Sequence, residues 1–149
     1  MIGIGDQIPG RVQGFQKGPY NCLVSSLRKA AVLVVEDDSA LRAVYRAILK
    51  GAGYAVVAVE DGIGALQTLD NDELPNAVVL DLMLPRLSGS DVGRELRSRA
   101  DTRDIPIIVV TCTDTTDIEG VDVDCFIRKP VPPERLIQAV EICTRKRSG

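Results

Sequence analysis

Two hydrophobic patterns alternate along the chain from residue 31 onward. Short, continuous apolar runs are each followed by a segment in which apolar residues recur every three or four positions. Continuous runs are typical of strands buried on both faces of a parallel sheet, and the longer period is typical of helices that cover such a sheet. The alternation predicts an α/β fold with strands at residues 31–35, 54–59, 77–80, 106–110 and 125–128.

Four helices are predicted after these strands, at residues 39–50, 62–69, 89–99 and 132–146. The first has the clearest apolar stripe, and it ends where two nearby glycines favour a helix stop. Its stripe comprises Leu41, Val44, Tyr45, Ile48 and Leu49. The last helix is expected to bury Leu136, Ile137, Val140 and Ile142. In the third, Glu95 and Arg99 have the i,i+4 spacing of a helical ion pair.

The length of 149 residues and an ordinary globular composition predict one domain with one core. Residues 1–30 differ from the rest, because glycine and proline are frequent there and weaken both helix and strand. We interpret residues 1–30 as a flexible N-terminal extension, or as an arm that docks a partner, and residues 31–149 as the folded domain.

Composition excludes several classes of function. The net charge of −3 gives no global positive field, so no direct contact with nucleic acid is expected. No apolar stretch is long enough for a membrane helix and no secretory signal is recognisable, so we expect a cytoplasmic protein without membrane contact. The sequence has no histidine, which excludes histidine-dependent nucleophiles and histidine metal sites. The four cysteines form no CxxC pair and are interpreted as reduced, mostly buried thiols.

Reactive polar side chains follow four of the five apolar runs. They are Glu36, Asp37 and Asp38 after the first run, Asp81 after the third, Thr111 after the fourth and Lys129 after the fifth. The carboxyl ends of parallel strands lie on one edge of a sheet. These side chains are therefore expected to converge in one crevice.

Three crowded carboxylates favour binding of a cation, because two unit charges ~4 Å apart repel by ~4 kcal/mol at an effective dielectric constant of ~20. Oxygen ligands without thiolate or imidazole favour a hard ion, and the absence of an EF-hand motif favours Mg²⁺ over Ca²⁺. Lys129 and Thr111 could contact phosphoryl oxygens, and Asp81 is the candidate nucleophile. Alternatively, Asp37 or Asp38 caps the first helix and does nothing more.

Four motifs, in this order, resemble the receiver domain of two-component response regulators: VLVVEDD, VVLDLMLPRLSG, PIIVVTC and FIRKP. The resemblance covers about residues 32–142. It implies a flavodoxin-like, doubly wound parallel sheet of five strands in the order 2-1-3-4-5. It also implies that Asp81 accepts a phosphoryl group from a sensor histidine kinase or a phosphotransfer protein.

The resemblance assigns further roles around Asp81. Glu36 and Asp37 match the acidic pair of the family, in which Asp37 would bind Mg²⁺ directly and Glu36 would act through water. Met83 would offer its backbone carbonyl to the ion.

On the phosphoryl side, Lys129 matches the lysine that contacts the phosphoryl oxygens, and its bond to Pro130 resembles one that is typically cis. Thr111 and Phe126 match the hydroxyl and the aromatic residue of the family's conformational switch.

One segment departs from the family pattern. Residues 112–125 are rich in aspartate and threonine, which favour caps and turns, so the fourth helix of the fold is expected to be short, irregular or missing. This puts the family's usual dimer interface in doubt, and we expect a monomer or a weak dimer.

Few residues follow the last predicted helix, so the sequence predicts a stand-alone receiver that is not an enzyme and that signals by phosphorylation-dependent binding to a downstream protein effector. A second hypothesis is a pseudo-receiver, a binding module that ignores phosphorylation. A third is a Mg²⁺-dependent phosphohydrolase of the haloacid dehalogenase type, in which a second aspartate would stand at the position of Met83.

Overall fold

A five-stranded parallel sheet forms the centre of the molecule. The computed structural model describes residues 29–112 and 120–148, and the fold is given for these residues. The strand order is β2-β1-β3-β4-β5, as predicted. The strands are β1 (Ala31–Val35), β2 (Ala55–Val59), β3 (Ala77–Leu80), β4 (Ile107–Thr111) and β5 (Cys125–Arg128).

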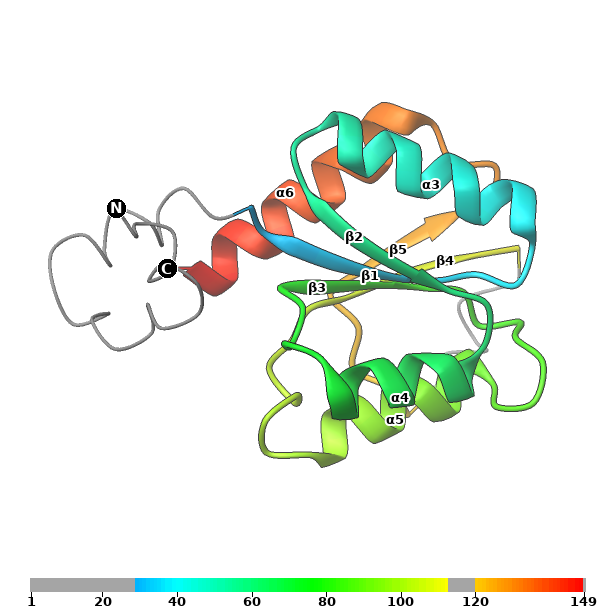
Figure 1. Ribbon diagram of the computed structural model, residues 1–149, viewed down its shortest axis with the longest axis vertical. Coiled ribbons are helices and arrows are strands. Elements are labelled where there is room, and N and C mark those ends of the chain that lie inside the picture. Colours follow the sequence, from blue (N-terminus) through cyan, green and yellow to red (C-terminus); the bar gives the residue numbers. More distant parts are fainter. Residues whose placement is uncertain (1–28, 113–119, 149) are drawn as a thin grey trace, which may run out of the picture.

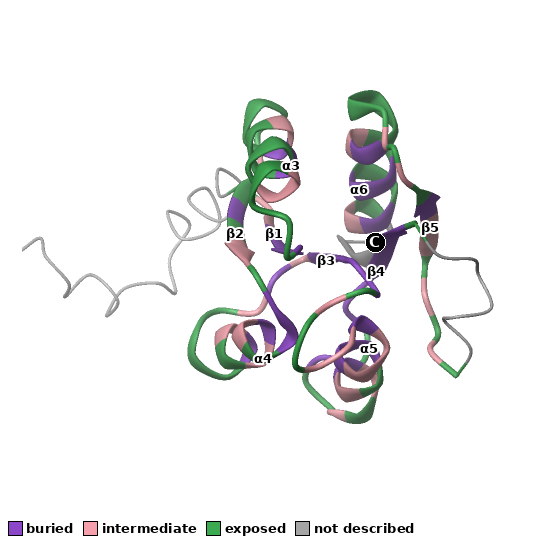
Figure 2. Cartoon of the chain, turned by 90° about the vertical axis from the view of Figure 1, so that its right-hand side faces the viewer, coloured by how far each residue is buried: buried purple, intermediate pink, exposed green. Residues whose placement is uncertain are grey.

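Two helices cover each face of the sheet, so the described part of the chain has three layers (Figures 1 and 2). Helices α3 (Ser39–Gly51) and α6 (Pro133–Ser148) lie on one face. Helices α4 (Gly62–Asn71) and α5 (Gly89–Ser98) lie on the other. The predicted order of strands and helices is confirmed within two residues at each boundary.

Each face of the sheet has its own apolar core, because alternate residues of the buried strands point to opposite sides. On the α3 and α6 face, Val32 and Val34 of β1 pack with Tyr45 and Leu49. On the α4 and α5 face, Leu33 and Val35 pack with the apolar residues of those helices. The central strands β3 and β4 are buried along their whole length, which is why they appear in the sequence as continuous apolar runs.

Two residues of the predicted helical stripes lie outside the core. Val44 is 49% exposed and Ile142 is 50% exposed. Each comes one position before a buried residue, Tyr45 and Cys143, and one position turns a side chain by about 100° around a helix. The prediction that both are inward-facing was therefore wrong.

The segment between β4 and β5 includes residues 113–119, which lie outside the described residues together with residues 1–28. The predicted N-terminal extension and most of the expected irregular fourth helix fall in these ranges. Residues 120–124 are not helical. They lie against α5, where a Cβ on Gly93 would come within 2.7 Å of Val121 Cγ1.

Arg97 of α5 holds the same segment with its guanidinium group. Its Nε–H donates to the Asp122 carbonyl at 2.9 Å, and its Nη2 pairs with the Asp124 carboxylate at 3.1 Å. Its Nη1 donates to the carbonyls of Arg103 and Ile105. The approach to β5 is therefore fixed to α5 by side-chain contacts.

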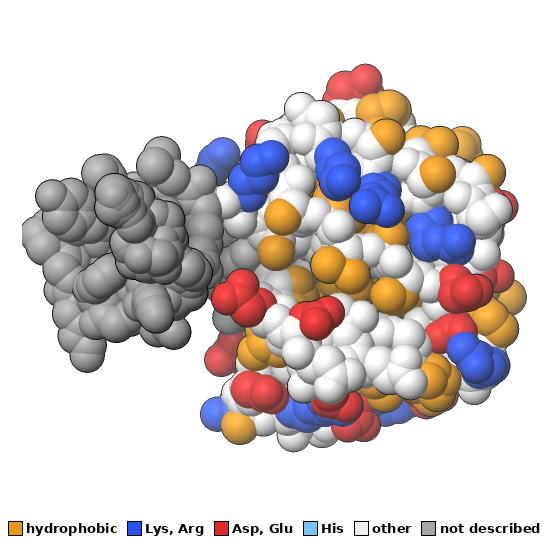
Figure 3. Space-filling model, viewed as in Figure 1, with side chains coloured by type: hydrophobic (Ala, Val, Ile, Leu, Met, Phe, Trp, Pro, Cys, Tyr) orange, Lys and Arg blue, Asp and Glu red, His pale blue; other side chains and the backbone are white. Residues whose placement is uncertain are grey.

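Basic side chains gather along one helix at the surface. The exposed or half-buried Arg42, Arg46 and Lys50 follow one another at four-residue spacing on α3, and blue side chains line this helix in Figure 3. Among the described cysteines, which were expected to be mostly buried, Cys143 is buried, Cys125 is half-buried and Cys112 is exposed. None of the described helices has the length and apolar character that crossing a membrane requires.

Candidate functional site

Glu36 and Asp81 meet because β1 and β3 end side by side. In the register of the sheet, Val35 of β1 lies beside Leu80 of β3. Strand pairing continues one residue further, since the Asp81 N–H donates to the Val35 carbonyl at 3.1 Å and the Glu36 N–H donates to the Val59 carbonyl at 3.1 Å. The parallel register therefore places Glu36 and Asp81 next to each other.

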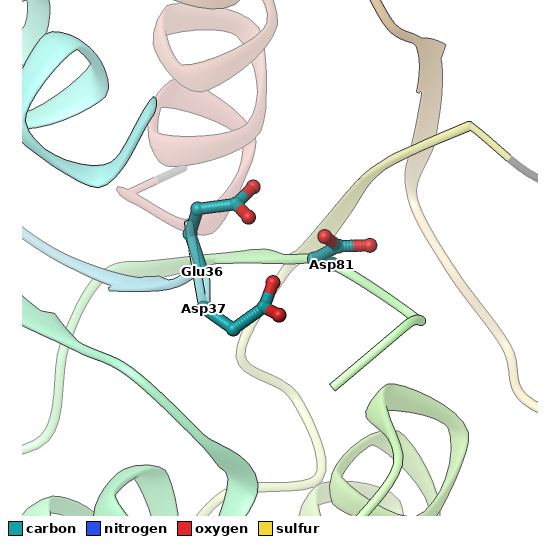
Figure 4. A group of neighbouring side chains, drawn as sticks. All are labelled: Glu36, Asp37 and Asp81. Atoms are coloured by element: carbon teal, nitrogen blue, oxygen red, sulfur yellow. The ribbon is translucent and has the colours of Figure 1, made fainter. Parts of the chain in front are cut away.

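Three carboxylates point into one space at this edge (Figure 4). Each of Glu36, Asp37 and Asp81 offers one oxygen, and these oxygens lie within 4.8 Å of one another. Glu36 and Asp81 are buried, at 1% and 4% exposure, whereas Asp37 faces solvent. The site is therefore open on one side and enclosed by protein on the other.

Lys129 brings a positive charge to the same carboxylates. Its Nζ lies 2.9 Å from Asp81 Oδ2 and 2.8 Å from Glu36 Oε1. Burial by itself would lower the pKa of Lys129, but its hydrogen bonds and ion pairs with Glu36 and Asp81 outweigh burial and raise the pKa above its ordinary value. The ammonium therefore stays protonated throughout the neutral range.

Burial acts on the pKa of Glu36 in the opposite direction to its effect on Lys129, because it disfavours the charged form of either group. Desolvation raises the pKa of Glu36, and contacts with Lys129 and with the Asp38 N–H, which donates to Glu36 Oε2 at 3.1 Å, oppose that rise. Glu36 Oε1 is enclosed and lies 2.8 Å from the Lys129 ammonium. This oxygen retains capacity for a further electropositive partner.

Helix capping accounts for one of the three acids that follow β1. Asp38 is the N-cap of α3, and its carboxylate accepts hydrogen bonds from the backbone N–H groups of Ala40 and Leu41. Asp37 does not have this role, so capping explains Asp38 and leaves Asp37 facing Asp81.

Asp81 is held by backbone as well as by Lys129. Its Oδ1 accepts the Met83 N–H at 3.0 Å, while the Met83 side chain is 62% exposed. A glycine allows the start of α5 to pack against this residue, since a Cβ on Gly89 would clash with the Asp81 carbonyl and lie 2.5 Å from Leu82 Cα. The first contact orients the Asp81 carboxylate, and the second positions the Asp81 backbone.

The two predicted switch residues lie on adjacent strands. Thr111 is the last residue of β4 and is fully buried, and its carbonyl accepts the Lys129 N–H at 3.0 Å. Phe126 of β5 is half-buried and packs against the core on the α4 and α5 face. The Lys129–Pro130 peptide bond is cis, as the motif indicated.

The sequence residues and the geometry match one family of known proteins. A family model described as "response regulator receiver domain" matches residues 32–141. The chain belongs to the response regulator receiver domain family. Its resemblance in sequence is thereby confirmed, and receiver domains are signalling phosphoacceptors rather than classical enzymes.

The curated relatives that the chain matches are response regulators. The response regulator MprA of Mycobacterium sp. (strain KMS) is 40% identical over 121 residues, which make up 78% of this chain and 51% of the relative. The chain thus spans about half the length of the curated relatives it matches.

Solved receiver structures have the same fold. The receiver domain of a sensor histidine kinase from Pseudomonas aeruginosa PAO1, with a magnesium ion coordinated in its active site cleft, is 27% identical, with a TM-score of 0.74 over 79% of this chain and 99% of that chain. The chemotaxis response regulator CheY4 of Vibrio cholerae is 23% identical, with a TM-score of 0.73 over 78% and 99% of the two chains, and it supports the fold alone.

The receiver's acidic cluster suits a hard divalent cation. Its ligand atoms are carboxylate oxygens, which Mg²⁺ prefers. Glu36, Asp37 and Asp81 could therefore hold the ion from the protein side, with the open side left to solvent or a phosphoryl group.

The sequence analysis did not identify Arg42, which contacts the backbone of two residues of the receiver site. The Arg42 Nη1 donates to the Glu36 carbonyl at 2.9 Å and lies 3.4 Å from the Asp37 carbonyl. The only signal in the sequence was its place on the first turns of the helix after the acidic residues, which many surface arginines share.

Proposed function

We propose that this receiver accepts a phosphoryl group on Asp81 and changes its affinity for a partner protein as a result. One observation carries the proposal. The carboxylates of Glu36, Asp37 and Asp81 converge within 4.8 Å, and a lysine ammonium lies 2.9 Å from the Asp81 carboxylate. A nucleophilic carboxylate, an oxygen-lined cation site and a fixed ammonium are the recurring parts of phosphoryl transfer.

In the transfer step, a carboxylate oxygen of Asp81 forms a bond to phosphorus while the bond from phosphorus to the donor breaks. The donor is a phosphohistidine of a sensor histidine kinase or phosphotransfer protein, and its imidazole nitrogen keeps the electron pair of the broken bond. Mg²⁺, when bound at this site, would supply positive charge to neutralise the phosphoryl oxygens. Glu36, Asp37, Asp81 and the Met83 carbonyl are the proposed Mg²⁺ site.

After transfer, the side chains of Lys129 and Thr111 stabilise the aspartyl phosphate formed on Asp81. The protonated ammonium of Lys129 already contacts Asp81. It can therefore pair with the oxygens of a phosphoryl group on Asp81 without gaining or losing a proton. Thr111 at the end of β4 and Phe126 on β5 are the proposed switch, because a phosphoryl group can shift a conformational equilibrium only through contacts that differ between the two states.

The downstream partner is proposed to be a protein. The expectations of a monomer or weak dimer, of a cytoplasmic location and of no direct contact with nucleic acid stay predictions. The acidic net charge of −3 supports the last of these for the chain as a whole.

Exposure to acetyl phosphate and Mg²⁺, followed by intact mass measurement at neutral pH, tests the proposal. The parent protein should gain one phosphoryl group, Asp81→Asn should gain none, and the exposed-site control Asp70→Asn should behave like the parent. No mass gain in the parent would support the phosphorylation-independent binding module instead. Continuous phosphate release from a small phosphoester, abolished in Asp81→Asn, would support the phosphohydrolase.

A further inference from the structure

The loop between β3 and α5 carries Met83, and a buried carboxylate outside the acidic cluster holds this loop. Asp61 is 4% exposed and caps α4, since its Oδ1 accepts the Gly64 N–H at 2.7 Å. Its other oxygen, Oδ2, pairs with the guanidinium of Arg86, which comes three residues after Met83. One side chain thus serves both the helix start and the loop.

The start of α4 and the loop between β3 and α5 are closely packed beside this ion pair. A Cβ on Gly62, the first residue of α4, would lie 2.5 Å from the Leu87 carbonyl oxygen and 2.8 Å from Leu87 Cβ. The loop and the start of α4 therefore touch beside the ion pair, and Gly62 is required for that approach.

The loop backbone is compact around Arg86. The Leu87 N–H donates to the Pro85 carbonyl at 2.7 Å, and the Gly89 N–H donates to the Leu82 carbonyl at 3.0 Å. Arg86 has a φ of 66°, in the left-handed region that favours glycine. Arg86 therefore has a backbone conformation that favours glycine, and its side chain makes the ion pair with Asp61.

We propose that Asp61 and Arg86 are a positioning pair that fixes the Met83 loop for magnesium binding. This inference rests on the proposed function, because Met83 is there a backbone ligand of the ion. The pair does not contact the cation. It acts by restricting where the Met83 carbonyl can lie relative to Asp81, whose Oδ1 accepts the Met83 N–H.

A positioning role can be separated from a structural one because the Arg86 side chain is 63% exposed. The Asp61 side chain is only 6% exposed, so Arg86 is the better position at which to separate the two roles. Arg86→Gly also removes the unfavourable left-handed conformation of a non-glycine residue, so this variant should fold at least as well as Arg86→Ala. Asp61→Asn keeps a residue that caps helices well and removes the charge.

A matched control lies between the same two helices. Arg99 joins α5 to α4 through Asp70 at 2.6 Å, in an arrangement like that of Arg86 and Asp61, but it contacts no residue of the Met83 loop in the described structure. Arg99→Ala removes a comparable link and should leave magnesium binding unchanged.

The experiment is titration calorimetry with MgCl₂ on chelator-treated protein, with thermal melting measured for each variant. Arg86→Gly and Asp61→Asn should weaken Mg²⁺ binding by about tenfold, as loss of an outer support of a metal site does. The melting temperature of Arg86→Gly should stay close to that of the parent, whereas Asp61→Asn should melt somewhat lower at neutral pH, because the ionised Asp61 contributes stability. Arg86→Lys should restore part of the affinity, and Arg99→Ala should match the parent.

Parent-like Mg²⁺ affinity in both Arg86→Gly and Asp61→Asn, with weakened affinity in Asp37→Asn, would overturn the positioning pair and leave the proposed site intact. Parent-like affinity in Asp37→Asn would overturn the proposed site itself, and the positioning pair with it.

Discussion

Gly89 brings helix α5 into contact with the backbone of the proposed phosphoacceptor. A methyl group at this position would clash with the Asp81 carbonyl and would lie 2.5 Å from Leu82 Cα, both of which are backbone atoms with little room to move. The glycine is needed here for space, because its backbone conformation is an ordinary helical one.

Gly89→Ala should therefore lower the free energy of unfolding by about 3 kcal/mol, as overpacking against backbone does, and should weaken Mg²⁺ binding as Asp81 shifts. Urea denaturation measures the first effect. Gly51→Ala is the matched control, since no atom lies within 4 Å of its added Cβ, and it should be neutral or slightly stabilising. Equal stability of Gly89→Ala and the parent would contradict the packing argument.

The contribution of Asp61 to stability should depend on pH. Hydrogen bonds from the Gly64 N–H and from Arg86 lower its pKa below the ordinary value. A carboxyl group whose pKa is lowered by folding contributes stability above its unfolded pKa of about 3.9, and this contribution is lost as the pH falls through the folded value. The parent should exceed Asp61→Asn in stability at neutral pH, and the difference should shrink below about pH 4.

Urea denaturation of both proteins from neutral to acid pH measures that difference. The other carboxyl groups are common to the two proteins, so their titration cancels. A difference that stays constant into the acid range would show that the ionised form of Asp61 gains nothing from its partners.

At the scale of elements, the strands were predictable because their signal is local. Residues 77–80 form a continuous apolar run, and the structure buries all four, so the pattern and its cause coincide. Polar residues at strand ends were predictable for a related reason: parallel pairing places Glu36, Asp81 and Lys129 at one edge wherever the strands are correct.

Contacts between side chains that are far apart in the sequence could not be predicted in this way. Asp61 and Arg86 are 25 positions apart, and Arg97 and Asp124 are 27 positions apart. No period or motif connects these pairs, and each arginine resembles an ordinary surface residue in the sequence. The inward placement of Val44 failed because the apolar stripe of α3 is wider than the face that the sheet covers.

The Arg97 contacts predict how the segment before β5 is held. Arg97→Ala removes hydrogen bonds to the carbonyls of Asp122, Arg103 and Ile105, and we expect a loss of about 1–2 kcal/mol with faster hydrogen exchange at residues 121–124. Mg²⁺ affinity should not change, since these carbonyls precede β4 and β5 and so lie at the opposite edge of the sheet from the acidic cluster.

Arg94→Ala is the control for that experiment, because Arg94 is exposed on the same helix and its described ion-pair partner is Asp91, three positions away. Unchanged exchange at residues 121–124 in Arg97→Ala would show that the segment is held by packing against Gly93 alone.

For the whole molecule, the acidic cluster sets a balance between stability and cation binding. Three carboxylates and one ammonium leave two net negative charges in a space where like charges ~4 Å apart repel by ~4 kcal/mol at an effective dielectric constant of ~20. Repulsion of this kind opposes folding, and a bound cation relieves it.

In chelator, Asp81→Asn should melt higher than the parent, by about 3 °C for ~1 kcal/mol of relieved repulsion. Added Mg²⁺ should reverse the order, because ligand at 100 times its Kd stabilises the parent by about 2.7 kcal/mol and the variant has lost a ligand. Thermal melting with chelator and with MgCl₂ measures both effects. Identical melting in chelator would mean that the Lys129 ion pair already compensates the repulsion.

The ammonium of the site belongs to Lys129, which directly follows β5, the last strand of the sheet to be synthesised. The acids that follow β1 emerge from the ribosome some ninety residues earlier, as the separation of Asp37 and Lys129 requires. A nascent chain that has built β1 to β4 displays the acidic crevice without its counter-charge. On the proposed function, we therefore expect a chain that stops before Lys129 to accept a phosphoryl group poorly, and an incomplete translation product to compete weakly with the finished protein for a phosphorylated kinase.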